Sequence, residues 1–341
     1  MSGTSLDGLD LCYARFTKPA ALPWEYEILK TDTIPYSSLW QDKLKNAFHL
    51  RAESLLELNS SYGFYLGEKT KEFRQSLGSN PVDLIASHGH TVFHQPQLGF
   101  TYQIGDGRAI KALNVVSVVY DFRSQDVLLG GQGAPLVPIG DQLLFPSYDA
   151  CLNLGGFSNI SFVQNEKRIA FDIGPLNIVL NHFANQLSKP YDAEGKIARK
   201  GQIDATILTQ LNALDYYQKK GPKSLGLEWV VKTIFPLLSG LSPENAISTF
   251  TKHAAMQLSD VLKQNNLQKI LITGGGAYNH YLLEQTEALS GKSLSLPSKE
   301  LIEFKEALIF AFMGILRLRG ENNVLSSVTG SSMDHSSGLL L

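Results

Sequence analysis

Two hydrophobic spacings divide the chain into strands and helices. Short apolar or alternating runs predict strands over residues 9–16, 26–34, 83–86, 101–104, 115–120, 150–154, 160–163, 169–171, 270–272 and 294–296. Apolar residues three or four positions apart predict helices over 37–78, 108–113, 136–145, 203–214, 227–238 and 301–319, with others after Pro175, Ser242 and Asn279. Strands that alternate with helices are typical of an α/β fold.

One predicted strand ends in a carboxylate. The apolar run Ile169-Ala170-Phe171 is followed by Asp172, and a Gly-Pro turn stands at residues 174–175. We expect a buried strand that brings Asp172 to its C-terminal end, where ligands bind in open α/β sheets. We predict that Asp172 is a general base served by ATP-binding glycine loops. The alternative is an aspartate that caps the helix after Pro175.

Two glycine- and serine-rich segments, residues 1–8 and 155–159, border predicted strands and form a weak internal repeat. The backbone N–H groups of such hairpins can cradle a phosphate, and Asp7 and Asp10 could hold a metal through water. Two facing hairpins would suit a nucleoside triphosphate between duplicated domains, whereas the alternative is an ordinary turn. A phosphate hairpin needs a strand on each side, and the first strand is missing here. Either the hairpin has lost that strand or, as we favour, the true start lies upstream of Met1.

A third glycine cluster, Gly274–Gly276, follows the strand at 270–272 and precedes a helix. It would let a nucleotide lie against the backbone, with phosphate near a helix N-terminus. The spacing matches neither the dinucleotide fingerprint nor a Walker loop.

Three histidines, His88, His90 and His94, fall within seven residues. Without a supporting cysteine or third ligand cluster, we rank a sugar-contacting loop first, structural histidines second and a metal site last. Charged residues also follow the strand that ends at Tyr120, and the glycines at 130–133 allow close backbone approach or a hinge near the domain crossover. The serine-rich tail after residue 325 is expected to be loosely held.

The bulk properties limit the class of protein. The 341 residues allow two domains, and 43% hydrophobic and 18% charged residues are typical of a globular protein. A net charge of −2 gives no electrostatic reason to expect nucleic acid or an anionic membrane as a partner. Cys12 and Cys151 lie in apolar runs and are expected to be buried thiols in a reducing compartment. No apolar stretch is long enough to span a bilayer and no signal peptide is evident, so we expect a cytoplasmic protein.

Taken together, the motifs resemble those of the anhydro-N-acetylmuramic acid kinase family, which has the actin/Hsp70/sugar-kinase fold. The similar stretches run in family order along nearly the whole chain: Met1–Asp10, Ser87–His94, Gln103–Gly107, Asp121–Asp126, Gly130–Pro138, Asn153–Ser161, Phe171–Asn177, Tyr191–Gly195, Gly274–Asn279 and Glu306-Ala307.

The resemblance implies a substrate, 1,6-anhydro-N-acetylmuramic acid, whose ring is hydrolysed and whose freed 6-oxygen is phosphorylated by ATP in peptidoglycan recycling. Asp172 matches the residue that activates water, and Arg123 and Glu306 match positions near the sugar. Further sugar contacts are expected at His88, Thr91, Asp106 and Asn177. ATP contacts are expected at Gly3, Thr4, Ser5, Leu6, Asp7, Gly8, Leu9, Asp10, Gly155, Gly156, Gly274, Gly275, Gly276 and Asn279.

The resemblance also implies a two-domain actin-like ATPase fold with a central cleft that closes during turnover. We place domain I at residues 1–138 plus about 321–341, and domain II at residues 139–320. Mg²⁺ is expected to arrive with ATP, near Asp7. A homodimer is expected because family members form dimers.

Five positions near the expected pocket depart from the family pattern: His90, Leu176, Asn181, Leu225 and Leu227. They bear on the identity of the sugar more than on the fold. The alternatives are a kinase for another amino or anhydro sugar and an inactive nucleotide-binding member. Retention of Asp172, Asp7 and the glycine loops argues against an inactive member.

Overall fold

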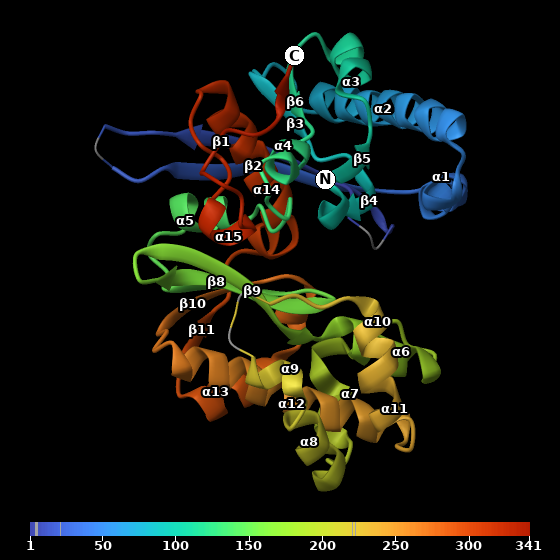
Figure 1. Ribbon diagram of the computed structural model, residues 1–341, viewed down its shortest axis with the longest axis vertical. Helices are drawn as coiled ribbons and strands as arrows, with labels where there is room; N and C mark the ends of the chain where they lie inside the picture. The colour runs from blue at the N-terminus through green and yellow to red at the C-terminus, as the bar shows by residue number, and fades with distance from the viewer. Residues whose placement is uncertain (4–5, 21, 220, 222) are drawn as a thin grey trace. The chain divides into compact units, whose positions relative to one another are not determined.

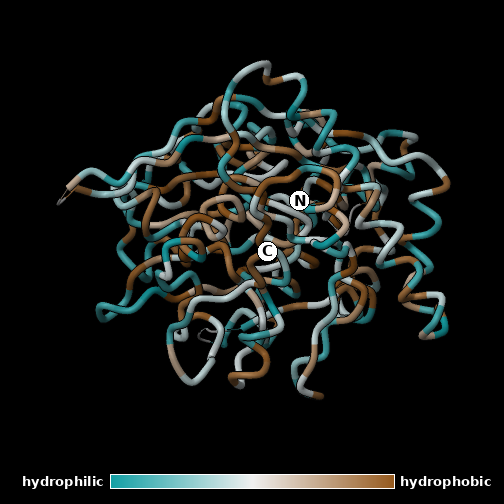
Figure 2. Tube along the Cα trace, turned by 90° about the horizontal axis from the view of Figure 1, so that it is seen from above, coloured by the Kyte–Doolittle hydropathy of each residue, from teal (hydrophilic) through white to brown (hydrophobic). Residues whose placement is uncertain are grey.

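The computed structural model describes residues 1–3, 6–20, 22–219, 221 and 223–341 (Figure 1). The chain forms two compact units: unit 1 contains Met1–Leu144 and Phe304–Leu341, and unit 2 contains Phe145–Glu303. Strands and helices alternate in both, so the α/β class predicted from the sequence is confirmed. Figure 2 colours the Cα trace by hydropathy and shows hydrophobic and hydrophilic residues alternating along the chain. This sequence pattern is the basis on which the elements were predicted.

Unit 2 is built on one five-stranded sheet with the order β11-β10-β7-β8-β9. Strands β7 (Ala150–Leu154), β8 (Phe157–Gln164) and β9 (Lys167–Pro175) form an antiparallel meander, and β10 (Lys269–Thr273) and β11 (Ser293–Ser295) run parallel to β7. Figure 1 shows the helices of this unit gathered on one side of the sheet.

The helices of unit 2 bury their apolar faces in a single core with strands β7 to β10. The long helix α12 starts as predicted, since Ser242 accepts a hydrogen bond from the Asn245 N–H and Pro243 occupies the first turn. The helical segments are α6 (Asn177–Gln186), η3 (Ala193–Gly195), α7 (Lys196–Lys200), α8 (Ala205–Asn212), α9 (Asp215–Gln218), α10 (Leu227–Trp229), η4 (Val230–Ile234), α11 (Phe235–Leu238), α12 (Pro243–Gln264), η5 (Gly275–Tyr278) and α13 (His280–Ser290).

Unit 1 contains three small sheets instead of one. The hairpin β1 (Gly8–Thr17) and β2 (Glu25–Pro35) forms the first, β12 (Leu339–Leu340), β6 (Ser117–Tyr120) and β3 (Leu84–Ser87) form the second, and β4 (His90–Gln95) and β5 (Phe100–Ile104) form the third. The remaining elements are α1 (Ser38–Asn46), η1 (Ala47–His49), α2 (Ala52–Gln75), η2 (Pro96–Leu98), α3 (Gly107–Asn114), α4 (Ser124–Leu128), α5 (Pro138–Leu144), α15 (Ser326–Thr329) and α14 (Lys299–Leu318), whose residues up to Glu303 belong to unit 2.

Two sequence predictions about unit 1 are wrong. The segment expected to be a histidine-bearing loop is largely strand β4, whose residues pair antiparallel with β5. The C-terminal tail is held firmly instead of loosely. Its Leu339 and Leu340 pair with β6, and Asn323, Ser331 and Ser337 are buried and hydrogen-bonded.

Candidate active site

The first residues form a hairpin turn in a shortened form. Ser2 bridges Leu9 in antiparallel fashion, the Met1 amino group donates to the Asp10 carbonyl at 2.7 Å, and the Asp10 N–H donates to the Met1 carbonyl at 2.9 Å. Gly3 and residues 6–7 therefore lie between Ser2 and the start of β1, and Asp7 is exposed there. Thr4 and Ser5, two of the predicted phosphate contacts, lie outside the described residues. Phosphate binding by the turn stays a prediction.

The sequence predicted Asp172 at the end of its strand, but Asp172 lies inside β9. The strand continues to Pro175 because the ladder slips between Ser158 and Asn159, which leaves a bulge beside Asp172. β9 is the edge strand of its sheet and pairs antiparallel with β8.

The backbone and side chain of Asp172 are held by the segment beyond helix α9. The Leu225 N–H donates to Oδ2 of Asp172 at 3.0 Å, the Asp172 N–H donates to the Lys223 carbonyl at 3.0 Å, and the Tyr216 hydroxyl donates to the Asp172 carbonyl at 2.6 Å. Burial raises the pKa of the Asp172 carboxyl, and the Leu225 N–H opposes that rise. Sequence reasoning missed Tyr216 and named Leu225 only as a departure from the family pattern, since a backbone donor such as the Leu225 N–H leaves no side-chain signature.

The alternative role for Asp172, capping of α6, is excluded. No side chain caps this helix. The backbone N–H groups of Leu176 and Ile178 donate to the Gly156 carbonyl, and the Asn177 N–H donates to the Gly155 carbonyl. Gly155 and Gly156 thus anchor the start of α6 through their carbonyl groups.

Unit 2 contains a pocket of about 410 Å³. Three segments that the sequence had singled out line it: the start of α6 with Asn177, the loop 191–194, and the glycine segment with Gly275 and Gly276. The structure thus groups Asn177, predicted as a sugar contact, with the glycine segment that was predicted to bind ATP. Nδ2 of Asn177 donates to the Leu154 carbonyl at 3.0 Å.

The glycines of this pocket have different roles. Gly274 has φ +83°, and a Cβ there would lie 2.5 Å from Oδ1 of Asn153, so only glycine fits. At Gly275 the nearest atom to an added Cβ is Nδ2 of Asn177 at 3.9 Å, an ordinary contact distance, so a methyl group would fit there. Asn279 caps α13 by accepting from the Leu282 N–H, which occupies its side-chain oxygen.

Unit 1 brings together Arg123, His88 and Glu306. Nε of Arg123 donates to Nε2 of His88 at 2.9 Å, and Nη1 donates to the Gly133 carbonyl at 2.6 Å. The rings of His88 and Phe310 meet edge to face with centroids 4.7 Å apart. Burial lowers the pKa of Arg123 to about 10, while the carboxylates of Glu306 and Asp126 oppose that shift. At neutral pH the guanidinium is charged.

The histidines make hydrogen bonds that fit a structural or substrate-facing role. His88 has its Nδ1 2.9 Å from the Gly89 carbonyl, and His90 has its Nδ1 3.2 Å from the Ser2 hydroxyl. His94 contacts the Thr101 hydroxyl at 3.1 Å. Across the described residues, no group of three or more His, Cys, Asp or Glu side chains is placed to hold a metal ion.

Asp106 and Thr91, both predicted as sugar contacts, are engaged within unit 1. Asp106 caps α3 through the Arg108 N–H, and both its oxygens accept from the Arg108 guanidinium. The Thr91 hydroxyl accepts from Nε2 of Gln103 at 3.4 Å. The three predicted catalytic residues are divided between the units, with Asp172 in unit 2 and Arg123 and Glu306 in unit 1.

A family model described as anhydro-N-acetylmuramic acid kinase matches residues 1–341. The chain belongs to this family. Curated relatives named anhydro-N-acetylmuramic acid kinase include one from Mannheimia succiniciproducens, 33% identical over 100% of this chain and 97% of its own length. Another, from Pseudomonas syringae, is 32% identical over 97% of this chain and 94% of its own. The family predicted from the motifs is therefore confirmed, and with it the prediction of a phosphotransferase.

Solved structures give more distant likenesses. A ROK family glucokinase from Streptomyces griseus in complex with glucose and AMPPNP is 12% identical, with a TM-score of 0.37, over 85% of this chain and 92% of that one. Among the described residues, no helix has the length and apolar character needed to cross a bilayer.

Proposed function

We propose that this chain uses ATP to convert 1,6-anhydro-N-acetylmuramic acid into N-acetylmuramic acid 6-phosphate. The full-length family match supports the substrate. The observation that carries the mechanism is the half-buried carboxylate of Asp172, held by the Leu225 N–H at a bulge in an edge strand. Burial raises its pKa, which makes it a stronger base than an exposed aspartate.

The reaction joins a hydrolysis to a phosphoryl transfer. Asp172 takes a proton from a water molecule whose oxygen attacks the anomeric carbon, and the bond from that carbon to the 6-oxygen breaks. The freed 6-oxygen attacks the terminal phosphorus of ATP, and ADP leaves. One water, one sugar and one ATP thus give the 6-phosphate, ADP and a proton.

The sugar-facing cation is assigned to Arg123. Its guanidinium offers planar donors, and Nη2 makes no hydrogen bond with any described residue, so it is available to a sugar oxygen. Glu306 and His88, which surround this guanidinium, complete the group. Thr91, Asp106 and Asn177 stay proposed contacts, although Arg108 occupies the Asp106 carboxylate in this structure.

The residues present fit ATP. The pocket of about 410 Å³ in unit 2 is bordered by Gly275 and Asn177 and can hold a nucleoside. In unit 1 the turn that precedes β1 is proposed to bind the phosphates through backbone N–H groups. Gly3, Thr4, Ser5, Leu6, Gly8 and Leu9 belong to that assignment, with Gly155, Gly156, Gly274, Gly276 and Asn279 in unit 2.

Mg²⁺ fits the same turn. Asp7 is exposed on it and Asp10 follows at the start of β1, so the donors are carboxylate oxygens of the kind this ion prefers. When bound with ATP, Mg²⁺ neutralises charge on the transferring phosphoryl group.

We further propose that the enzyme acts in the cytoplasm as a homodimer, with domain boundaries near residues 138 and 320. The free thiols of Cys12 and Cys151 support a reducing compartment. The departure at Leu225 leaves the contact with Asp172 intact because the backbone N–H supplies it.

The proposed function is tested by incubating the protein with ATP, Mg²⁺ and the anhydro sugar, and by measuring ADP and sugar 6-phosphate. N-acetylmuramic acid and 1,6-anhydro-N-acetylglucosamine serve as comparison substrates. We expect equal amounts of ADP and 6-phosphate from the anhydromuramic sugar and much slower turnover of the others. Preference for another sugar would reassign the substrate, and absence of turnover with all three would contradict kinase activity.

A further inference from the structure

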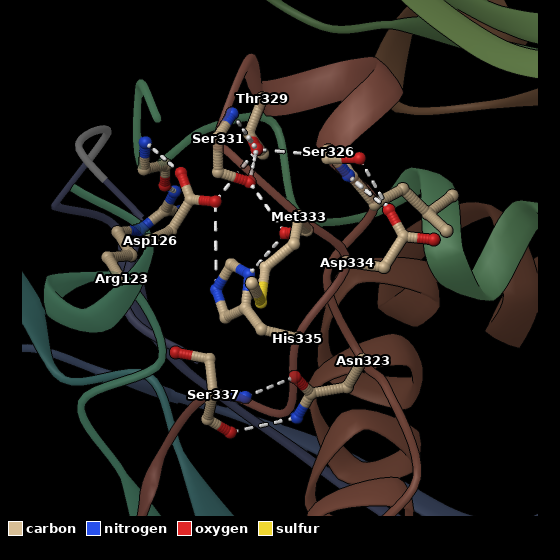
Figure 3. Close-up of polar contacts among 12 residues, drawn as sticks. Arg123, Asp126, Asn323, Ser326, Thr329, Ser331, Met333, Asp334, His335 and Ser337 are labelled. Atoms are coloured by element: carbon tan, nitrogen blue, oxygen red, sulfur yellow. Dashed lines mark hydrogen bonds and ion pairs between the residues drawn. The ribbon is translucent and has the colours of Figure 1, made fainter. Parts of the chain in front are cut away.

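Asp126, on the short helix α4, is a completely buried carboxylate three residues beyond Arg123 (Figure 3). The Thr329 hydroxyl donates to its Oδ1 at 2.7 Å, and the Gly133 N–H donates to its Oδ2 at 2.7 Å. Nε2 of His335 is 3.7 Å from Oδ1, too far for a hydrogen bond. A buried charge must be compensated locally, and these two donors are its hydrogen-bond partners.

The backbone of Gly133 connects Asp126 with Arg123. Its N–H is held by the Asp126 carboxylate, and its carbonyl accepts from Nη1 of Arg123 at 2.6 Å. Gly133 has φ +68°, a conformation that favours glycine, and a Cβ there would press on Val127. The carboxylate thereby fixes the carbonyl that anchors one nitrogen of the guanidinium.

The C-terminal segment secures this arrangement from the other side. The Gln132 N–H donates to the Thr329 carbonyl at 2.8 Å, and the Ser332 N–H donates to the Leu129 carbonyl at 3.0 Å. The Ser337 hydroxyl donates to the Phe122 carbonyl at 2.8 Å. Residues on both sides of Arg123 are therefore tied to a segment some 200 positions later in the chain.

The Thr329 hydroxyl has one proton and three nearby acceptors. Asp126 Oδ1 is at 2.7 Å, Ser331 Oγ at 3.1 Å and the Leu325 carbonyl at 3.4 Å. The charged and closest acceptor takes the proton, since charge-assisted hydrogen bonds are the shortest and strongest. Loss of this hydroxyl would leave Oδ1 of Asp126 buried without its donor.

We propose that Asp126 and Thr329 are positioning residues for the sugar-facing cation: through Gly133 they hold the Arg123 guanidinium in the orientation that meets the sugar. The inference rests on the proposed function, in which Arg123 contacts the sugar. Neither Asp126 nor Thr329 touches substrate in this scheme. Their effect reaches the reaction only through Arg123, and that restriction makes the idea testable.

The test uses a matched pair at one position. Thr329→Val keeps the shape but removes the hydroxyl, and Thr329→Ser keeps the hydroxyl. Thr286→Val is the control for loss of a buried hydroxyl in unit 2, where the Thr286 hydroxyl donates to the Leu282 carbonyl at 2.8 Å. We expect kcat/KM for the sugar to fall about 10-fold in Thr329→Val, with the KM for ATP unchanged. Thr329→Ser and Thr286→Val should stay within about twofold of wild type.

A second comparison asks whether the effect passes through Arg123. In an Arg123→Ala background, Thr329→Val should reduce the residual kcat/KM by less than about twofold, because the group being positioned is gone. A full additional 10-fold loss there would overturn the proposal. So would equal losses in Thr329→Val and Thr286→Val.

A spectroscopic measurement separates this inference from the proposed function. The ¹⁵N resonance of Nε2 of His88, which accepts from Arg123, should move in Thr329→Val and keep its wild-type position in Thr329→Ser. It can be assigned by its loss in His88→Gln. If the wild type turns over no anhydro sugar, the proposed function fails while this resonance still decides the positioning. An unmoved resonance in Thr329→Val would contradict the proposal.

Discussion

In unit 1, the hydrogen bond between Arg123 and His88 determines which imidazole nitrogen of His88 carries the proton. Nε of Arg123 is only a donor, so Nε2 of His88, 2.9 Å away, must be the acceptor. The proton of the imidazole therefore lies on Nδ1, which donates to the Gly89 carbonyl at 2.9 Å. Burial and the charge of Arg123 lower the pKa of His88 well below its ordinary value. His88 is a neutral acceptor that orients a cation.

The acceptor at position 88 is predicted to matter more than the ring. His88→Leu removes the partner of Nε, which costs about 1–3 kcal/mol where a charged donor is left without one. We expect a higher KM for the sugar, with the KM for ATP preserved, in steady-state kinetics. His88→Gln presents an amide oxygen and should recover most of the loss. Equal effects of the two substitutions would show that the ring, and not the acceptor, is required.

The acid limb of the pH–rate profile is predicted to follow Asp172. The base must be ionised, so kcat falls as the pH drops through its raised pKa. Leu225→Pro removes the N–H that opposes the rise, and the acid limb should move to higher pH. Leu225→Ala keeps the N–H and should leave the limb in place. If the acid limb does not move in Leu225→Pro, either Asp172 is not the general base or the Leu225 N–H does not lower its pKa.

Two neighbouring glycines are predicted to separate nucleotide binding from stability. Gly275→Ala adds a methyl group to the lining of the pocket without a clash, so the KM for ATP should rise about 10-fold without a change in melting temperature. Gly274→Ala should lower the melting temperature, because φ is +83° and Asn153 occupies the space. An unchanged KM for ATP in Gly275→Ala would move the nucleoside away from this pocket.

Stability is predicted to decline on mild acidification because histidines such as His90 and His253 are buried in the neutral form. Burial lowers the pKa of His90 to about 4 and that of His253 to about 3. The unfolded chain binds protons at these positions below about pH 6.5, while the folded chain does not until those lower values. Each histidine therefore leaves stability unaffected above pH 6.5 and reduces it by about 1.4 kcal/mol per pH unit below that.

His253→Gln checks the sign of this effect. The substitution removes the titrating group while keeping a donor for Oδ1 of Asn212, which lies 2.7 Å from Nδ1 of His253. The loss of unfolding free energy between pH 7 and pH 5, measured with urea, should be about 2 kcal/mol smaller in the variant than in wild type. A larger loss in the variant would mean that His253 is charged in the folded protein.

Local patterns predicted the elements well because they depend on short spacings. The strand before Asp172, the cap at Ser242 and the glycines at 274–276 each carry their signal within a few residues. The bulge that lets β9 run on to Pro175 depends on its pairing with β8, where the register slips between Ser158 and Asn159. A single segment read alone cannot show that slip, so the end of β9 was misplaced.

Contacts distant in sequence explain what the patterns missed. The serine-rich tail looked solvent-exposed, yet Thr329 donates to Asp126, 203 residues earlier. The histidine segment was predicted as a loop, whereas it forms strand β4. Its pairing with β5 includes a register shift between Thr91 and Phe93, which the segment alone does not reveal. Arg123 and Glu306 were assigned from resemblance alone, and the fold brings their charges within range of each other.

One measurement tests the central claim most directly: mass spectrometry of the products that wild type and Asp172→Asn form from ATP and 1,6-anhydro-N-acetylmuramic acid. Wild type should give ADP and a sugar heavier than the substrate by one water and one phosphoryl group. Asp172→Asn should bind ATP normally but form the product at least about 10²-fold more slowly. Product formation at the wild-type rate by Asp172→Asn would contradict the assignment of the base and with it the mechanism.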